Sequence, residues 1–229
     1  MVLCAMFAFL FAGCAMVPRR LVVGNYQPGN IYRSSEVLPP QIRRVAILPL
    51  TISSSTSLLE SGTEILSPVL QSEIVKAKRF EVVIISLEQL HQWTGQSSWK
   101  SDEPLPPDFF EHLRQMVGCD AVLFCQLTSY QPYPPLAIGW KFNLVTKMEA
   151  DKKGEAVPDT HPKETVQILW SADEVFNAGM AEVANGAEAY SALHLHNDAP
   201  LAESASILSS PLRFGQYSLS TLFETLPSR

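Results

Sequence analysis

Two short groups of residues carry side chains that could do acid–base or metal chemistry. His194 and His196 lie two positions apart, and Asp173 and Glu174 are adjacent carboxylates that follow an apolar run. A metal site needs three or four converging ligands, and no third ligand lies near the histidine pair in sequence. A carboxylate pair needs a cleft that separates its pKa values before it can work as an acid and a base. We therefore interpret the histidines as the end of a helix and the carboxylates as a turn after a strand.

No compact catalytic signature occurs in the sequence: G-x-S-x-G, G-x-x-x-x-G-K and H-E-x-x-H are all absent. His91, His112 and His161 are scattered among polar residues, which is typical of exposed side chains. We expect a protein that is not an enzyme, with no catalytic residue, no cofactor and no bound metal. An envelope hydrolase that uses Asp173, Glu174 or a histidine is the alternative.

The most specific pattern is at the N-terminus. Residues 1–12 are apolar, and the run closes with Phe11-Ala12-Gly13-Cys14. This tetrapeptide resembles the bacterial lipobox, in which small residues admit the backbone to the signal peptidase, although Phe11 replaces the usual aliphatic residue. We expect removal of residues 1–13 as a signal peptide and lipidation of Cys14. Two or more acyl chains, such as palmitate, on that residue would anchor the protein stably to membrane lipid.

A transmembrane helix is the other interpretation of this run. A bilayer requires about 20 apolar residues, and Pro18-Arg19-Arg20 ends the run too early. No lysine or arginine precedes the run, which departs from an ordinary signal peptide. Ala15, rather than the aspartate that retains many lipoproteins at the inner membrane, follows the cysteine. By that resemblance we expect an outer-membrane anchor with the body facing the periplasm.

Charge is unevenly distributed along the 229 residues, whose net charge is -6. Residues 14–44 are basic, with five arginines against Glu36, and the remainder is acidic. An acidic body argues against nucleic-acid binding, which needs a basic face. The basic segment could contact anionic lipid headgroups, or it could be a solvated linker.

Two cysteines remain once Cys4 is removed with the signal peptide and Cys14 is lipidated: Cys119 and Cys125. One alternative is a disulfide between them, which an oxidising compartment would allow. The alternative, which their positions at a helix end and in a strand favour, is that both are small buried residues.

The chain divides into a short tether over 14–42, rich in turn residues, and a single domain over 43–229. Apolar runs at 44–50, 80–85 and 121–127 predict strands buried on both faces, and intervening helical patterns make these three strands parallel. Alternation at 137–145 and 165–171 predicts an antiparallel hairpin.

Pro68 leaves two alternatives for the helix over 59–78, a bend or a new start capped by Ser67. The fold class is α/β (α+β): a mixed sheet of about five strands, covered by helices, three of them at 107–117, 180–195 and 211–226.

Part of this pattern resembles a broad group of envelope lipoprotein domains. The strand Arg44–Leu50, the "RFEVV" segment at 79–83 and the "GCDAVL" segment at 118–123 are similar to the curli secretion channel lipoprotein, the lipoprotein activator of penicillin-binding proteins and the N-terminal domain of TolB. The resemblance covers residues 44–130. It implies an α/β fold and a role in recruiting or assembling other proteins, and it transfers no catalytic residue. The short segment 15–42 departs from the long tether of the activator.

Four aromatic residues could form a partner-binding patch, because tryptophan and tyrosine are favoured at interfaces: Trp93, Trp99, Tyr130 and Tyr133. The alternative is that they pack on the body. We expect a non-catalytic envelope lipoprotein that docks another envelope protein. The alternatives are a homo-oligomeric secretion-channel component that inserts the 137–171 hairpin, and the hydrolase.

Overall fold

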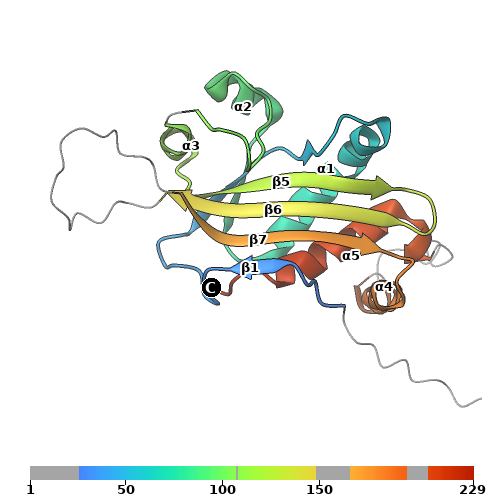
Figure 1. Ribbon diagram of the computed structural model, residues 1–229. Helices are drawn as coiled ribbons and strands as arrows, with labels where there is room; N and C mark the ends of the chain where they lie inside the picture. Colours follow the sequence, from blue (N-terminus) through green and yellow to red (C-terminus); the bar gives the residue numbers. More distant parts are fainter. Residues whose placement is uncertain (1–25, 107, 148–165, 195–205) are drawn as a thin grey trace, which may run out of the picture.

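A seven-stranded mixed sheet forms the centre of the molecule (Figure 1). The computed structural model describes residues 26–106, 108–147, 166–194 and 206–229. Neighbouring strands follow the order β1-β7-β6-β5-β2-β4, and β3 pairs with β5. The strands are β1 (Ile31–Arg33), β2 (Arg44–Ile47), β3 (Thr51–Ile52), β4 (Glu81–Ile84), β5 (Ala121–Gln131), β6 (Ala137–Lys147) and β7 (Val166–Asn177).

Strand β2 lies between β4 and β5 and is parallel to both. Val45, Ala46 and Ile47 are all buried, because helices cover both faces of the sheet at this point. Strands of this kind are continuously apolar rather than alternating. The prediction of three parallel strands is confirmed, and so is the mixed α/β fold class.

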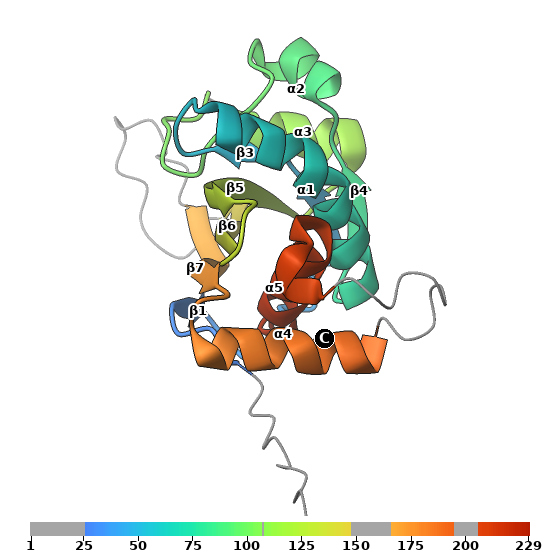
Figure 2. The same ribbon diagram turned by 90° about the vertical axis from the view of Figure 1, so that its right-hand side faces the viewer.

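The two crossovers lie on opposite faces of the sheet. Helix α1 (Ser57–Ala77) joins β2 to β4 and packs in the larger core together with α4 (Ala181–His194) and α5 (Pro211–Glu224). Helices α2 (Leu87–Thr94) and α3 (Phe109–Val117) join β4 to β5 and enclose a smaller core on the other face. A short 3₁₀ turn, η1 (Ile207–Ser209), precedes α5. Figure 1 shows β5, β6 and β7 side by side with α1 and α5 behind them, and Figure 2 shows α4 below α5.

Helix α1 continues through Pro68 as one helix, so the second alternative, a new helix that starts at Pro68, is wrong. Its N-cap Thr56 accepts a hydrogen bond from the Leu59 amide, and Lys78 closes its C-terminus in the left-handed conformation. The hydroxyl of Ser67 donates to the Thr63 carbonyl at 2.6 Å, so Ser67 does not cap a new helix.

Strands β5, β6 and β7 form an antiparallel meander, which confirms the predicted hairpin. Trp140 and Trp170 face the larger core and are fully buried. Strand β7 is longer than the predicted 165–171 and runs on to Asn177. Asp173 and Glu174 therefore lie inside a strand, and the predicted turn is wrong.

Residues 26–42 form a strap that lies on the body. Strand β1 pairs antiparallel with β7, and Leu38 and Ile42 are each 4% exposed. Farther along, the Leu38 amide donates to the Ser228 carbonyl at 2.8 Å, which joins the strap to the C-terminal end. The predicted tether is thus wrong for residues 26–42, because this segment supplies a strand and two core side chains. Residues 14–25, with Cys14, lie outside the described residues.

Of the helices that the model describes, none has the length and apolarity needed to cross a membrane.

Candidate functional site

The two carboxylates considered for catalysis point to opposite faces of β7, because successive side chains alternate along a strand. Asp173 is exposed. Glu174 is half-buried, and its carboxylate accepts hydrogen bonds from Tyr26 Oη at 2.9 Å and from the amides of Gly29 at 2.8 Å and Asn30 at 3.2 Å. The structure thus places the two carboxylates on different faces, and residues of the strap donate the hydrogen bonds that Glu174 accepts.

The histidines are also dispersed. His194 is exposed at the end of α4, and its ring stacks on Tyr190 with 4.5 Å between centroids. His91 and His112 are exposed on α2 and α3, whereas His161 and His196 lie outside the described residues. Within the part of the chain that the model describes, no group of three metal-ligating side chains converges.

The four aromatic residues do not form a patch. Trp99 is 6% exposed in the smaller core, and Tyr130 is 5% exposed in the larger core on the other face of the sheet. Trp93 is partly buried against the smaller core, and Tyr133 is 74% exposed. The predicted patch is wrong for Trp99 and Tyr130, because both side chains are buried in the two cores.

Cys119 and Cys125 are free and buried, as the favoured alternative expects. Burial raises the pKa of the Cys119 thiol to about 11, and full burial raises the pKa of Cys125 further. A thiol is nucleophilic only when it is ionised, so both are inert near neutral pH.

A hollow of about 590 Å³ opens at the carboxyl ends of β2 and β3. The helices that follow β2 and β4 leave on opposite faces of the sheet, and in open α/β sheets this is the position where ligands bind. The hollow is lined by the serine-rich loop at 53–55, by Glu60 and Thr63 of α1, and by Ser98, Lys100 and Glu103 of the segment after α2. The hollow therefore presents serine and threonine hydroxyls, together with two carboxylates and one ammonium group.

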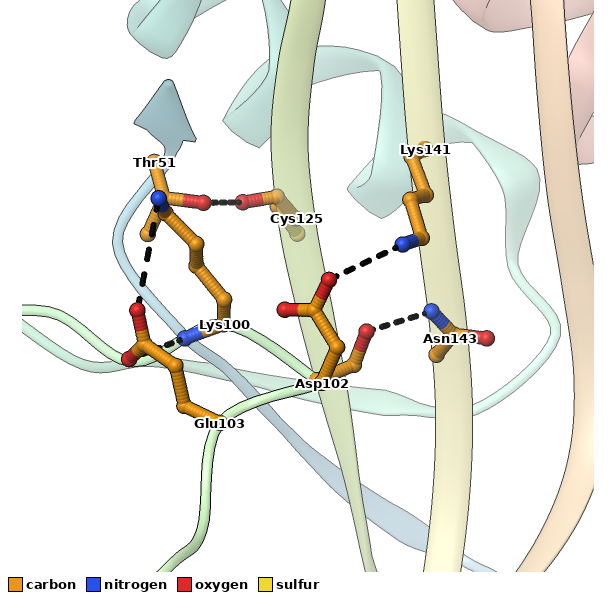
Figure 3. Close-up of polar contacts among 8 residues, drawn as sticks. Thr51, Lys100, Asp102, Glu103, Cys125, Lys141 and Asn143 are labelled. Atoms are coloured by element: carbon orange, nitrogen blue, oxygen red, sulfur yellow. Dashed lines mark hydrogen bonds and ion pairs between the residues drawn. The ribbon is translucent and has the colours of Figure 1, made fainter. Parts of the chain in front are cut away.

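The segment at 95–106 forms one wall of the hollow and is attached to the sheet (Figure 3). Ser101 accepts a hydrogen bond of 2.7 Å from the Asn143 amide, and Asp102 lies 3.4 Å from Lys141 Nζ. The indole of Trp99 fixes the same segment from inside by donating to Thr94 at 2.8 Å. Two residues of β6 therefore set the position of a wall that lines the hollow.

Opposite charges within that wall are close but loosely paired. Lys100 Nζ lies 4.0 Å from Glu103, whose other oxygen accepts from the Lys100 amide at 3.3 Å. Thr51, which also lines the hollow, donates to the Cys125 carbonyl at 2.9 Å (Figure 3). The lining residues named for this hollow include no histidine or cysteine, and the arrangement suits hydrogen bonding to a polar group.

Sequence reasoning did not find this hollow. Its lining comes from a serine/threonine-rich loop and a proline-bearing loop, and neither contains a motif that predicts a site. The available signal was topological: once three strands are predicted to be parallel with β2 central, the carboxyl end of β2 is the place to examine.

No protein-family model matches the chain, and no curated protein matches it. Solved structures with a similar fold include the lipoprotein GNA1162 from Neisseria meningitidis, at 17% identity over 58% of this chain and 79% of that chain, with a TM-score of 0.35. The PelC dodecamer from Paraburkholderia phytofirmans matches at 11% identity over 87% and 98% of the two chains, with a TM-score of 0.39. The hypothetical protein CT253 from Chlamydia trachomatis matches at 11% identity over 80% and 93%, with a TM-score of 0.41. Likeness this remote carries no functional argument.

Proposed function

We propose that this protein is a non-catalytic lipoprotein of the bacterial cell envelope, anchored through acyl chains on Cys14, whose body docks or helps to assemble another envelope protein. The lipobox-like Phe11-Ala12-Gly13-Cys14 supports the anchor. The outer membrane, with the body in the periplasm, is the location that the Ala15 position favours.

The observation that carries the non-catalytic part of the proposal is the use of Glu174. A general acid must present an oxygen to its substrate. Both oxygens of Glu174 instead accept hydrogen bonds, from Tyr26 on one side and from Gly29 and Asn30 on the other. The best-placed carboxylate of the sequence thus serves to hold the segment that leads toward Cys14.

The secretion-channel alternative requires the β6–β7 hairpin to place its apolar side chains in lipid. In this structure that apolar side covers α5: Trp140 Nε1 donates to Ser218 and Trp170 Nε1 donates to Thr225. Insertion would expose the core beneath the hairpin and leave both indoles without these partners. We therefore favour the docking role.

The anchor is tested by metabolic labelling with an alkyne fatty acid in cells that express the wild type, Cys14→Ser or Cys4→Ser. We expect label in the wild type and in Cys4→Ser, and none in Cys14→Ser. Cys4→Ser is the matched control, because it removes a thiol from the segment that is cleaved. Label that persists in Cys14→Ser would overturn the proposed anchor.

The docking role is tested by placing a photo-crosslinking amino acid at exposed positions on different sides of the body, such as Tyr32, Tyr133 and Leu212. We expect a discrete adduct with one other envelope protein from positions on one side only. The adduct should weaken in the Cys14→Ser background, because the anchor brings the two proteins together. Adducts only between copies of this chain would support the oligomeric alternative instead.

A further inference from the structure

The strap at 26–42 is attached at its N-terminal end through one side chain of β7. The carboxylate of Glu174 gathers three donors from residues 26–30: the Tyr26 hydroxyl and the amides of Gly29 and Asn30. Hydrogen bonds to a charged acceptor are about twice as strong as neutral ones. Glu174 lies at the same position as Trp140 across the β6–β7 pair, so it stands on an otherwise apolar side of the strand.

Apolar packing supports this attachment over a small area. The Tyr26 ring lies edge-to-face against Phe176 with 5.3 Å between centroids. Tyr26 also lies beside Gly186 of α4, where a Cβ would come within 3.3 Å of the Tyr26 Cβ. The absence of a side chain at Gly186 makes room first for the Tyr217 ring of α5, and also for Tyr26 at the start of the strap.

The next part of the strap is held without Glu174: Ile31 packs against the larger core, Arg33 Nε donates to the Thr225 carbonyl, and the Ser34 hydroxyl donates to the Leu169 carbonyl. Strand β1 contributes three residue pairs with β7, and the side chains of Tyr32 and Arg33 are exposed. Leu38 and Ile42, in contrast, are buried in the larger core. From Ile31 onward the strap is thus held by contacts of its own, which include hydrogen bonds from Ser228 to the Glu36 carbonyl, whereas residues 26–30 are held mainly through Glu174.

We propose that Glu174 is a latch that holds residues 26–30 on the body and so limits how far the body reaches from the membrane; this rests on the proposed anchor at Cys14. With the strap latched, the twelve residues from Cys14 to Tyr26 span at most ~43 Å. With the strap released as far as Ile31, seventeen residues span at most ~61 Å. One carboxylate therefore controls about 18 Å of the maximum reach.

Tension on the anchor would load this latch first. The chain meets Glu174 before it meets β1, so a pull from the membrane side acts on the three hydrogen bonds before the β1–β7 pairs. A body bound to a partner far from the membrane would release residues 26–30, and a body near the membrane would keep them in place.

The first test is hydrogen–deuterium exchange of the mature chain from residue 14, carrying Cys14→Ser, in wild-type, Glu174→Gln and Asp173→Asn forms. Glu174→Gln keeps the shape and removes the charge. Asp173→Asn makes the same change on the adjacent residue, whose side chain points to the other face. We expect exchange at 27–30 to rise at least tenfold in Glu174→Gln and to stay unchanged in Asp173→Asn, with β1, β5 and β6 unaffected in both. Equal exchange in all three forms, or faster exchange throughout the sheet in Glu174→Gln, would overturn the latch.

The second test couples the mature chain through its Cys14 thiol to a maleimide lipid in a supported bilayer and measures the height of the body by neutron reflectometry. Cys119 and Cys125 are buried and do not compete. Lengthening the linker from twelve to seventeen residues should raise the mean height by about 4 Å, from the square-root dependence of linker span on residue number. No rise in Glu174→Gln, despite faster exchange of its strap, would overturn the control of reach. Both tests are independent of acylation in cells, so they distinguish failure of the latch from failure of the proposed anchor.

Discussion

The indole nitrogen of Trp140 donates a hydrogen bond of 2.9 Å to the hydroxyl of Ser218, and neither residue has exposed surface. The same hydroxyl donates to the Gly215 carbonyl at 2.9 Å. The Ser218 hydroxyl therefore accepts the hydrogen bond of a buried donor in β6, and its own proton is bound by a carbonyl within α5. This contact joins the centre of the meander to the helix that covers it.

Replacing Ser218 by alanine leaves the Trp140 indole N–H buried without an acceptor. The cost of such an orphaned group is about 1–3 kcal/mol. We expect Ser218→Ala to lower the free energy of unfolding, measured in urea, by that amount. Ser61→Ala, at an exposed position of α1, should change it little. In a double-mutant cycle, Trp140→Phe should cost less in the Ser218→Ala background than in the wild type, and equal costs would show that the contact contributes nothing.

Gly62 lies where α1 touches the end of β5. A Cβ at this position would lie 2.7 Å from Tyr130 Cγ and 2.9 Å from Leu127 Cδ2, both of them in the core. In an unhindered helix, Gly→Ala stabilises by about 1 kcal/mol. Here we expect Gly62→Ala to destabilise by about 1–3 kcal/mol, because the ring must move in a packed core. An increase in the midpoint of thermal unfolding would contradict this close approach.

The buried thiol of Cys119 makes stability depend on alkaline pH. Its pKa is raised to about 11 from the ordinary value of 9.0 by desolvation, so the folded state holds its proton longer than the unfolded state does. The stability contribution is fully present below pH 9 and is lost as the pH rises through 11. Urea midpoints should fall over this window, and the fall should be smaller in Cys119→Ala. Identical slopes for the two proteins would contradict the raised pKa.

Asn143 holds the wall of the hollow through Ser101. Loss of one such hydrogen bond costs about 1 kcal/mol, which corresponds to about a fivefold change in a local opening equilibrium. We expect Asn143→Ala to speed hydrogen–deuterium exchange at 100–106 about fivefold while α2 is unchanged. Asn185→Ala, at an exposed position of α4, serves as the control. Unchanged exchange at 100–106 would mean that the Asn143–Ser101 hydrogen bond does not position the wall.

The parallel strands were predictable because a strand buried on both faces must be apolar throughout, as Val45, Ala46 and Ile47 are. The hairpin was predictable because one of its faces is covered and the other is not, which produces alternation. The far half of β7 was missed at Glu174, where a carboxylate occupies an apolar position of the alternation. That residue is stable there because three donors of the strap satisfy it, and none of them is near it in sequence.

The strap and the hollow were missed for a related reason. The turn residues Gln27-Pro28-Gly29-Asn30 are typical of a loop, and a three-residue strand has too little periodicity to be recognised. Trp99 and Tyr130 show the complementary limit: an aromatic residue beside polar neighbours can be a surface or a core residue, and only the tertiary contacts decide. Candidate sites made by segments distant in sequence lie beyond what spacing can reveal.

The position of β2 between β4 and β5 has a kinetic consequence. Strand β2 can pair on both sides only after residues 121–123 of β5, which lie far along the chain, have joined the sheet. Strands β5 and β6, in contrast, are joined by a short turn. Bringing distant segments together costs loop-closure entropy, and proteins dominated by such pairings fold slowly. We expect the local β5–β6 pair to form early and to offer the template on which the N-terminal strands later assemble.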